Sequence, residues 1–380
     1  MLRFILHTIA ACLLLAACTS EEPQTFTPQK EKTVLMYIIA DNSLSQYSMR
    51  DVNRIKENLG NNIDNANFLI MIDREGDTPE LLCLHKDKDG DIMESIVARF
   101  EEQNIADMDF LKSTLEEVKK RFPADKYSLD IWSHGMSWIP DNIPFYAPDS
   151  KWIGQDGNNY LNIDLLADAI EQSGMRFDYI LFDACLMSSI ETLYELRNAA
   201  DRIIASPIEI WSYSFPYERI ADMMCDSENR AADIAGQYAA YYDGESEYRT
   251  GAVTVIDCAG LETLAAEAAK LFEGTAVKAE DIMTADIQRY DRYTYEIMYD
   301  MKEYYVQAAE ICGKDIAPFL EQLDKTIVYR YSTDRFANII IDTDNTCGIG
   351  TYIPVAGYSL WNDYYATLDW FKAVSRLPFI

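Results

Sequence analysis

Histidine is scarce in this chain: its 380 residues include only three, His7, His85 and His134. His7 lies in an apolar N-terminal stretch, and His85 is followed by a run of charged residues that is typical of a solvated surface. Imidazole is the most common general base in enzymes that work near neutral pH. The scarcity therefore leaves His134 as the one histidine placed where acid–base chemistry is expected.

Basic residues are also few, because 33 lysines and arginines face 63 aspartates and glutamates, for a formal net charge of −30. Such an acidic surface disfavours nucleic acid and anionic lipid surfaces as partners. It suits an exported soluble domain that attracts cationic peptides. We therefore expect protein or peptide partners and no nucleic acid.

Closely spaced cysteines are absent. Beyond Cys12 and Cys18, the cysteines lie far apart and none forms a C-x-x-C pair: Cys83, Cys185, Cys225, Cys258, Cys312 and Cys347. This spacing indicates neither a zinc site nor a small disulfide framework. We expect no metal site and no cofactor, and the presence of one or two disulfides stays open.

An acidic stretch from Asp87 to Asp91 superficially resembles a calcium-binding loop. Its glycine and its later ligand positions do not fit an EF-hand, whereas Asp89-Gly90 is a typical hairpin turn. We therefore expect a β-hairpin between strands at 81–85 and 92–97. Dependence on calcium stays open, without support from the sequence.

The N-terminus has no apolar run long enough to span a membrane in the mature protein. Arg3 precedes a short apolar stretch, and Leu15-Ala16-Ala17-Cys18 resembles the lipobox of bacterial lipoproteins. The resemblance implies that residues 1–17 are a signal peptide and that Cys18 is lipidated, with 18–32 as a flexible tether. An ordinary secretory cleavage site is the alternative. We expect export and lipid anchoring to a bacterial envelope, at the outer membrane. Whether the protein is exposed at the cell surface stays open.

Apolar runs with few charges alternate with amphipathic segments between residues 33 and 258. Residues 32–40 and 67–73 are typical of strands buried on both faces, and 46–59, 108–121 and 161–172 are typical of helices. This alternation predicts an α/β domain with a mostly parallel central sheet flanked by helices. Functional side chains are then expected where the strands end.

The character of the chain changes after residue 258. Helices are predicted over 259–272, over the tyrosine-rich 286–309 and over 318–329, with short strands at 336–342 and 348–354. We therefore expect a second, mainly helical domain over 259–380. The tyrosines are at helical spacing, which favours packing between helices over a sugar-binding platform.

Two buried strands end on reactive side chains. Residues 127–135 lead to His134 and Gly135, and residues 177–185 lead to Cys185. As a thiolate, Cys185 can attack a carbonyl while His134 protonates the leaving group, and the backbone N–H groups of Gly135 and Cys185 can stabilise the oxyanion. The alternatives are a hydrogen-bonded core histidine and a buried structural thiol.

The motifs Ser133-His134-Gly135 and Asp183-Ala184-Cys185 resemble the clostripain family of cysteine peptidases, as do segments 34–44 and 348–354. The similarity extends over most of the chain. It implies a caspase-like α/β fold, a catalytic His-Cys dyad and endopeptidase activity after basic residues. A non-catalytic surface lipoprotein that keeps the fold to bind peptides or glycans is the rival interpretation.

Three further residues are candidates for the substrate pocket: Asp183, Glu209 and Ser206. Asp183 lies two residues before the cysteine, so a continuous strand would point both side chains the same way. The resemblance also implies an acidic residue there in the specificity pocket. The alternative is an aspartate that caps a helix or orders a loop. Segment 206–211 departs from the family pattern, which leaves strict Arg/Lys preference open.

Lys151 is the only basic residue between His134 and Arg176. Enzymes of the clostripain type typically mature by internal cleavage after a basic residue, so the resemblance implies Lys151 as a self-cleavage site. An exposed loop lysine without such a role is the alternative.

Overall fold

A nine-stranded sheet forms the centre of the molecule. The computed structural model describes residues 28–140, 153–244, 250–274, 281–293 and 296–375. The sheet has the order β12-β10-β9-β8-β5-β1-β2-β3-β4. Its strands are β1 (Lys30–Ala40), β2 (Ala66–Arg74), β3 (Glu80–Lys86), β4 (Ile92–Arg99), β5 (Ala124–Trp132), β8 (Phe177–Asp183), β9 (Ala200–Ala205), β10 (Ala252–Asp257) and β12 (Ile327–Ser332).

The middle of the sheet is parallel, since β2, β1, β5, β8 and β9 pair in parallel, and its two edges are antiparallel. This confirms the predicted α/β fold with a mostly parallel sheet. The hairpin predicted around Asp89-Gly90 is also confirmed, because β3 pairs with β4 and Gly90 has a φ of 92°. The Asp87 carboxylate accepts the amides of Asp89 and Asp91 within that turn.

Strand β1 shows why the central strands read as continuous apolar runs. Alternate side chains enter two separate cores, so that Leu35, Tyr37 and Ile39 pack on one face and Val34, Met36 and Ile38 on the other. Both faces of the sheet are covered by helices, which favours apolar residues at successive positions of the strand. The strand begins at Lys30, so its first three residues fall within the range predicted as a tether.

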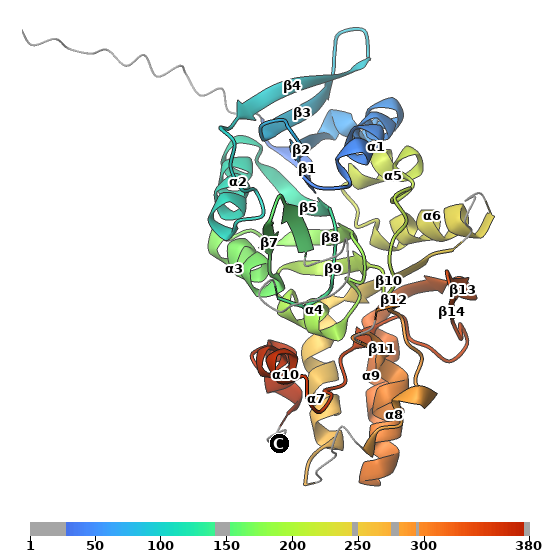
Figure 1. Ribbon diagram of the computed structural model, residues 1–380. Helices are drawn as coiled ribbons and strands as arrows, with labels where there is room; N and C mark the ends of the chain where they lie inside the picture. The colour runs from blue at the N-terminus through green and yellow to red at the C-terminus, as the bar shows by residue number, and fades with distance from the viewer. Residues whose placement is uncertain (1–27, 141–152, 245–249, 275–280, 294–295, 376–380) are drawn as a thin grey trace, which may run out of the picture.

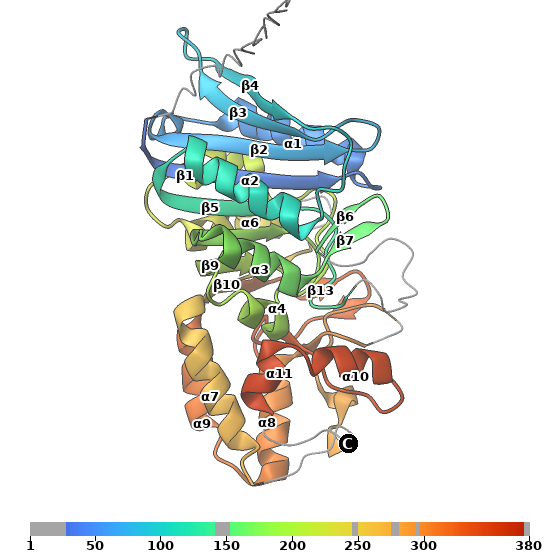
Figure 2. The same cartoon turned by 90° about the vertical axis from the view of Figure 1, so that its left-hand side faces the viewer.

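Helices lie on both faces of the sheet (Figures 1 and 2). One face packs against α2, α3 and α4, and the other against α1, α5 and α6. Their bounds are α1 (Ser45–Asn58), α2 (Met108–Arg121), α3 (Ile163–Ser173), α4 (Ile190–Glu195), α5 (Tyr217–Met224) and α6 (Ala231–Gly244). The helices predicted at 46–59, 108–121 and 161–172 are therefore confirmed as α1, α2 and α3.

The C-terminal third forms a helical lobe beyond the β10–β12 edge (Figure 1). It contains α7 (Leu261–Leu271), α8 (Met301–Cys312), α9 (Ala317–Thr326), α10 (Ser359–Tyr365) and α11 (Asp369–Val374). Short strands complete the structure: β6 (Ile153–Asp156), β7 (Asn159–Leu161), β11 (Tyr299–Asp300), β13 (Arg335–Phe336), β14 (Ile339–Ile340) and β15 (Gly350–Thr351).

This lobe is joined to the sheet more closely than the predicted division at residue 258 implies. Strand β12 comes from the C-terminal third and pairs with β10 to form the sheet edge. Buried side chains of α7, α8 and α11 belong to the same core cluster as those of α2 and α3. The two parts therefore share one hydrophobic core.

The helix predicted over 286–309 is wrong in its first half, since α8 begins only at Met301. Asp291 accepts the backbone amides of Tyr293, Ile297 and Met298, which holds this stretch in a non-helical conformation. Asp300 then caps α8 by accepting the amide of Glu303. Tyrosine spacing could not reveal these local carboxylate–amide bonds.

Among the residues that the structure describes, no helix is long and apolar enough to cross a membrane. The proposed signal peptide, Cys18 and Lys151 lie outside the described residues. The described cysteines are all free thiols: Cys83, Cys185, Cys225, Cys258, Cys312 and Cys347.

Candidate active site

His134 and Cys185 lie at the same edge of the sheet. Strands β5 and β8 are parallel neighbours, and Trp132 pairs with Asp183 at the end of their shared register. His134 and Cys185 each follow that paired position by two residues. The sheet thus brings a thiol and an imidazole to the carboxyl ends of adjacent strands, where parallel sheets place functional groups.

The loops that carry them are in direct contact through Gly135. A β-carbon on Gly135 would lie 2.5 Å from the carbonyl oxygen of Cys185 and 2.9 Å from the β-carbon of Ala184. Only glycine permits this approach. The position predicted to help form an oxyanion hole therefore lies against the backbone of the cysteine.

Ser43 contacts the imidazole: its Oγ lies 3.0 Å from Nε2 of His134. Ser43 follows β1 in a turn that Asn42 fixes, because the Asn42 amide donates to the carbonyl of Gln155 at 2.6 Å and accepts the amide of Leu44. Ser43 was not among the site residues predicted from the sequence. Its signal was its place just beyond the strand that pairs with β5.

Cys185 is partly buried and hydrogen-bonded to Ile210. The Ile210 amide lies 3.3 Å from Sγ, and Sγ lies 3.7 Å from the Ile210 carbonyl. Burial, followed by the charge of Glu209, raises the pKa of the Cys185 thiol to about 12. The sulfur is therefore a protonated thiol at neutral pH in this conformation, and it needs a base before it can attack.

The backbone just after the cysteine is strained. Leu186 has a φ of 62°, a left-handed conformation that is uncommon for a non-glycine residue, and its side chain is fully buried. Ser137, which follows His134 by three residues, has a φ of 60°. Sparsely populated backbone conformations persist where the surroundings fix them, and they are frequent at functional sites.

Segment 206–210 runs alongside the cysteine loop and supports it. The amide of Leu186 donates to the Ile208 carbonyl at 3.0 Å, and the amide of Ser188 donates to the Ser206 carbonyl at 2.9 Å. The Ser206 side chain is fully buried, and its hydroxyl bonds the backbone of Ile208. The hydroxyl therefore fixes this turn, and contact of Ser206 with substrate stays a prediction.

Asp183 is buried, with 5% of its surface exposed. Its Oδ2 accepts the Phe215 amide at 3.2 Å and the Tyr217 hydroxyl at 3.0 Å. It therefore orders the loop before α5, which was the alternative interpretation. Burial and the nearby Asp51 raise the pKa of Asp183 to about 7.

Asp183 is one member of a buried acidic cluster with Asp51 and Asp130. The Tyr217 hydroxyl bonds Asp130 and Asp183, and burial raises the pKa of Asp130 well above its usual value. Arg50 and Arg54 both pair with Asp51. With two raised pKa values and a third carboxylate paired with two arginines, the cluster carries little net negative charge at neutral pH.

Glu209 lies closer to solvent, with 20% of its side chain exposed, and it is paired within the protein. Arg292 Nε donates to its Oε2 at 2.5 Å, and the Tyr293 hydroxyl lies 3.3 Å from its Oε1. Arg292 was not among the predicted site residues, because it lies 83 residues from Glu209 along the chain and no motif surrounds it.

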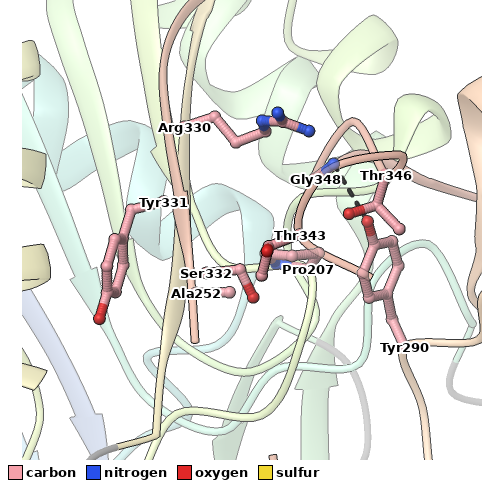
Figure 3. Close-up of a pocket in the computed structure, with 9 residues that line it drawn as sticks. All are labelled: Pro207, Ala252, Tyr290, Arg330, Tyr331, Ser332, Thr343, Thr346 and Gly348. Atoms are coloured by element: carbon pink, nitrogen blue, oxygen red, sulfur yellow. Dashed lines mark hydrogen bonds between the residues drawn. The ribbon is translucent and has the colours of Figure 1, made fainter. Parts of the chain in front are cut away.

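A groove of about 210 Å³ borders segment 206–210 at Pro207 (Figure 3). Its lining includes Pro207, Tyr290 and Arg330, but neither His134 nor Cys185. Figure 3 shows the Tyr290 hydroxyl directed at the Gly348 amide, 3.0 Å away. This groove is therefore distinct from the candidate active site. Among the described residues, no group of three or more His, Cys, Asp or Glu side chains is arranged to hold a metal ion.

The chain is similar to known cysteine peptidases over most of its length. Residues 36–378 match the model of the clostripain family. Clostripain of Hathewaya histolytica is 25% identical over 219 residues, which is 50% of this chain and 41% of that protein. The chain thus spans about two fifths of the length of that relative.

Solved structures cover nearly the whole chain. The X-ray structure of an inactive zymogen C11 protease from Parabacteroides distasonis has a TM-score of 0.78 at 30% identity and covers 92% of this chain and 100% of that one. A secreted C11 cysteine protease from Bacteroides thetaiotaomicron, in complex with an irreversible peptide inhibitor, has a TM-score of 0.77 at 28% identity. That match covers 91% of this chain and 99% of that one.

Proposed function

Because the chain belongs to the clostripain family of cysteine peptidases, we propose that it is an endopeptidase in which Cys185 is the nucleophile and His134 the general base and acid. The observation that carries this proposal is the register of β5 and β8, which brings both residues to one edge of the sheet. The contact of Gly135 with the Cys185 backbone ties the two loops together.

The chemistry follows from the protonated state of the thiol. His134 takes the proton of Cys185, and the thiolate attacks the scissile carbonyl to form a tetrahedral intermediate. The C–N bond then breaks, the imidazolium gives its proton to the leaving amine, and a thioester remains. Water, deprotonated by His134, hydrolyses the thioester and restores the thiol. The backbone N–H groups of Gly135 and Cys185 are the proposed donors to the oxyanion.

The proposed specificity is for a basic residue, Arg or Lys, on the amino side of the cleaved bond. Support comes from the negative charge around Cys185, which Asp183 supplies from below and Glu209 from the solvent side. A substrate cation is attracted by the charged form of Asp183, and by Glu209 where the cation replaces its pairing with Arg292. Asp183 can contribute to binding without moving out of its hydrogen bonds to the loop.

A lysyl acyloxymethyl ketone probe tests the proposed activity. We expect the folded wild type to be labelled and Cys185→Ala to remain unlabelled, with norleucyl and aspartyl probes reacting more slowly. Absence of labelling in the folded wild type, or equal labelling of Cys185→Ala, would contradict the peptidase proposal.

The proposed chemistry needs no cofactor, so activity should persist in EDTA. Loss of activity in EDTA that calcium restores would contradict the absence of a cofactor.

Maturation and location are part of the same proposal. Cleavage after Lys151 is supported by its place in the long segment after His134, and by the description of the Parabacteroides distasonis relative as an inactive zymogen. Mass spectrometry of the active protein should find a chain end at Lys151, and an intact active chain would contradict the proposed self-cleavage.

The lipobox-like motif supports export and lipidation at Cys18. Metabolic labelling with palmitate should therefore be lost in Cys18→Ala.

A further inference from the structure

Glu209 is held beside the nucleophile by its two neighbours in the chain. The Ile208 carbonyl accepts the Leu186 amide, and the Ile210 amide contacts the sulfur of Cys185 at 3.3 Å. Since Glu209 lies between these two residues, its backbone cannot move away without breaking contacts to the cysteine loop. The backbone of Glu209 is therefore fixed beside the cysteine loop.

The Glu209 carboxylate already has a cationic partner from the C-terminal part of the chain. Arg292 donates to Oε2 and Tyr293 to Oε1, so both oxygens are engaged. The Arg292 guanidinium also lies 5.7 Å from the centre of the Phe336 ring, which packs on Trp211 at 5.1 Å. The Glu209 carboxylate and the Phe336 ring thus both hold the Arg292 guanidinium in place.

The pair remains within reach of a substrate, because 38% of the Arg292 side chain and 20% of the Glu209 side chain are exposed. A guanidinium on Glu209 uses the same carboxylate oxygens that an arginine or lysine of a substrate would need. An incoming cation must therefore displace Arg292 or bind without Glu209. Either route weakens the capture of basic side chains.

We propose that Arg292 is a specificity-determining residue that neutralises Glu209 and so moderates the preference for basic side chains at the cleavage site. The inference rests on the proposed function, since it concerns the same cleft. Removal of the guanidinium exposes the Glu209 carboxylate to the substrate. The charge of Arg292 also opposes part of the rise that burial and Glu209 cause in the pKa of the Cys185 thiol, which links the pair to the nucleophile.

The test measures equilibrium binding in the Cys185→Ala background, so that it does not depend on turnover. The ligands are matched peptides that end in lysinamide, argininamide or norleucinamide. We expect Arg292→Met to tighten binding of the two basic peptides about tenfold relative to the norleucine peptide. Arg292→Lys keeps the charge and should bind like the parent.

A second variant tests whether the gain in affinity for basic peptides depends on Glu209. The gain should disappear when Glu209→Gln is added to Arg292→Met, whereas Glu209→Gln alone leaves an unpaired cation and should weaken binding of basic peptides. Unchanged relative affinity in folded Arg292→Met, or an equal gain for the norleucine peptide, overturns the inference. Failure of wild-type protein to react with the lysyl probe overturns the proposed function instead, so the two failures are distinguishable.

Discussion

Gly135 packs against the peptide of Cys185 so closely that a β-carbon at position 135 would lie 2.5 Å from the Cys185 carbonyl oxygen and 2.9 Å from its nitrogen. Both atoms belong to rigid backbone, so an added methyl group can be accommodated only if one loop moves. The contact makes the histidine loop and the cysteine loop one unit. Displacement of either loop therefore changes the position of the other.

Gly135→Ala should lower kcat/KM at least a hundredfold, because the shift separates the proposed dyad and its oxyanion donors. Overpacking of this kind costs about 1–3 kcal/mol, so the protein should still fold. Steady-state kinetics and thermal unfolding measure the two effects. Gly236→Ala is a matched control, since a β-carbon at this helical glycine has nothing within 4 Å and should leave kcat/KM unchanged. Wild-type activity in Gly135→Ala would show that this contact does not position the site.

Ser43 is a positioning residue for His134, because its hydroxyl lies 3.0 Å from Nε2 of the imidazole. Ser43→Ala should lower kcat about tenfold with little change in KM, and should shift the limb of the pH–kcat profile that reports the histidine. Ser43→Thr keeps the hydroxyl and should restore most of the rate. An unchanged pH profile in Ser43→Ala would contradict this role.

We expect Asp183 to make the capture of a basic substrate side chain depend on pH. Burial and Asp51 raise the pKa of Asp183 to about 7, so its carboxyl is neutral below this pH and charged above it. KM for a lysyl substrate should therefore fall as pH rises from about 6 to 8, while KM for a norleucyl substrate stays constant. In Asp183→Asn the lysyl KM should be higher and lose this dependence. A pH-dependent lysyl KM in Asp183→Asn would assign the titration to another group.

The sequence predicted the central fold well because the relevant signals are local. Period-two alternation between two covered faces made β1, β2, β5 and β8 continuous apolar runs, and each reactive residue lies just beyond one of them. Contacts between distant segments were not predictable in this way. Arg292 reaches Glu209 across 83 residues, and β12 completes the sheet from a region that composition marked as helical.

The same limit applies to the contacts of single side chains. Ser206 was expected to contact substrate because it follows a strand, but its hydroxyl turns back onto Ile208. Strand alternation would place Asp183 and Cys185 on one face, but β8 ends at Asp183, so the alternation does not extend to the cysteine and the pocket role of Asp183 stays a prediction. Side-chain direction beyond the end of a strand depends on the loop, which periodicity does not describe.

Asp73 should destabilise the fold at neutral and alkaline pH. It is 1% exposed at the end of β2, and among the described residues neither carboxylate oxygen has a hydrogen-bond partner. Burial and the nearby Asp156 raise the pKa of Asp73 to about 8. The folded state therefore binds this proton more tightly than the unfolded chain, whose aspartate pKa is about 4. The stability contributed by the proton is complete below about pH 4 and is lost as pH rises through about 8.

Asp73→Asn removes this ionisation while it keeps the shape of the side chain. The difference in Tm between the variant and wild type should therefore grow in favour of the variant as pH rises from 5 to 8.5. Thermal unfolding at matched ionic strength measures it, with the exposed Asp89→Asn as a control that should show no such trend. Because Asp73 lies outside the proposed dyad, kcat/KM at pH 7 should stay close to the wild-type value. A Tm difference that is independent of pH would mean that Asp73 titrates normally in the folded protein.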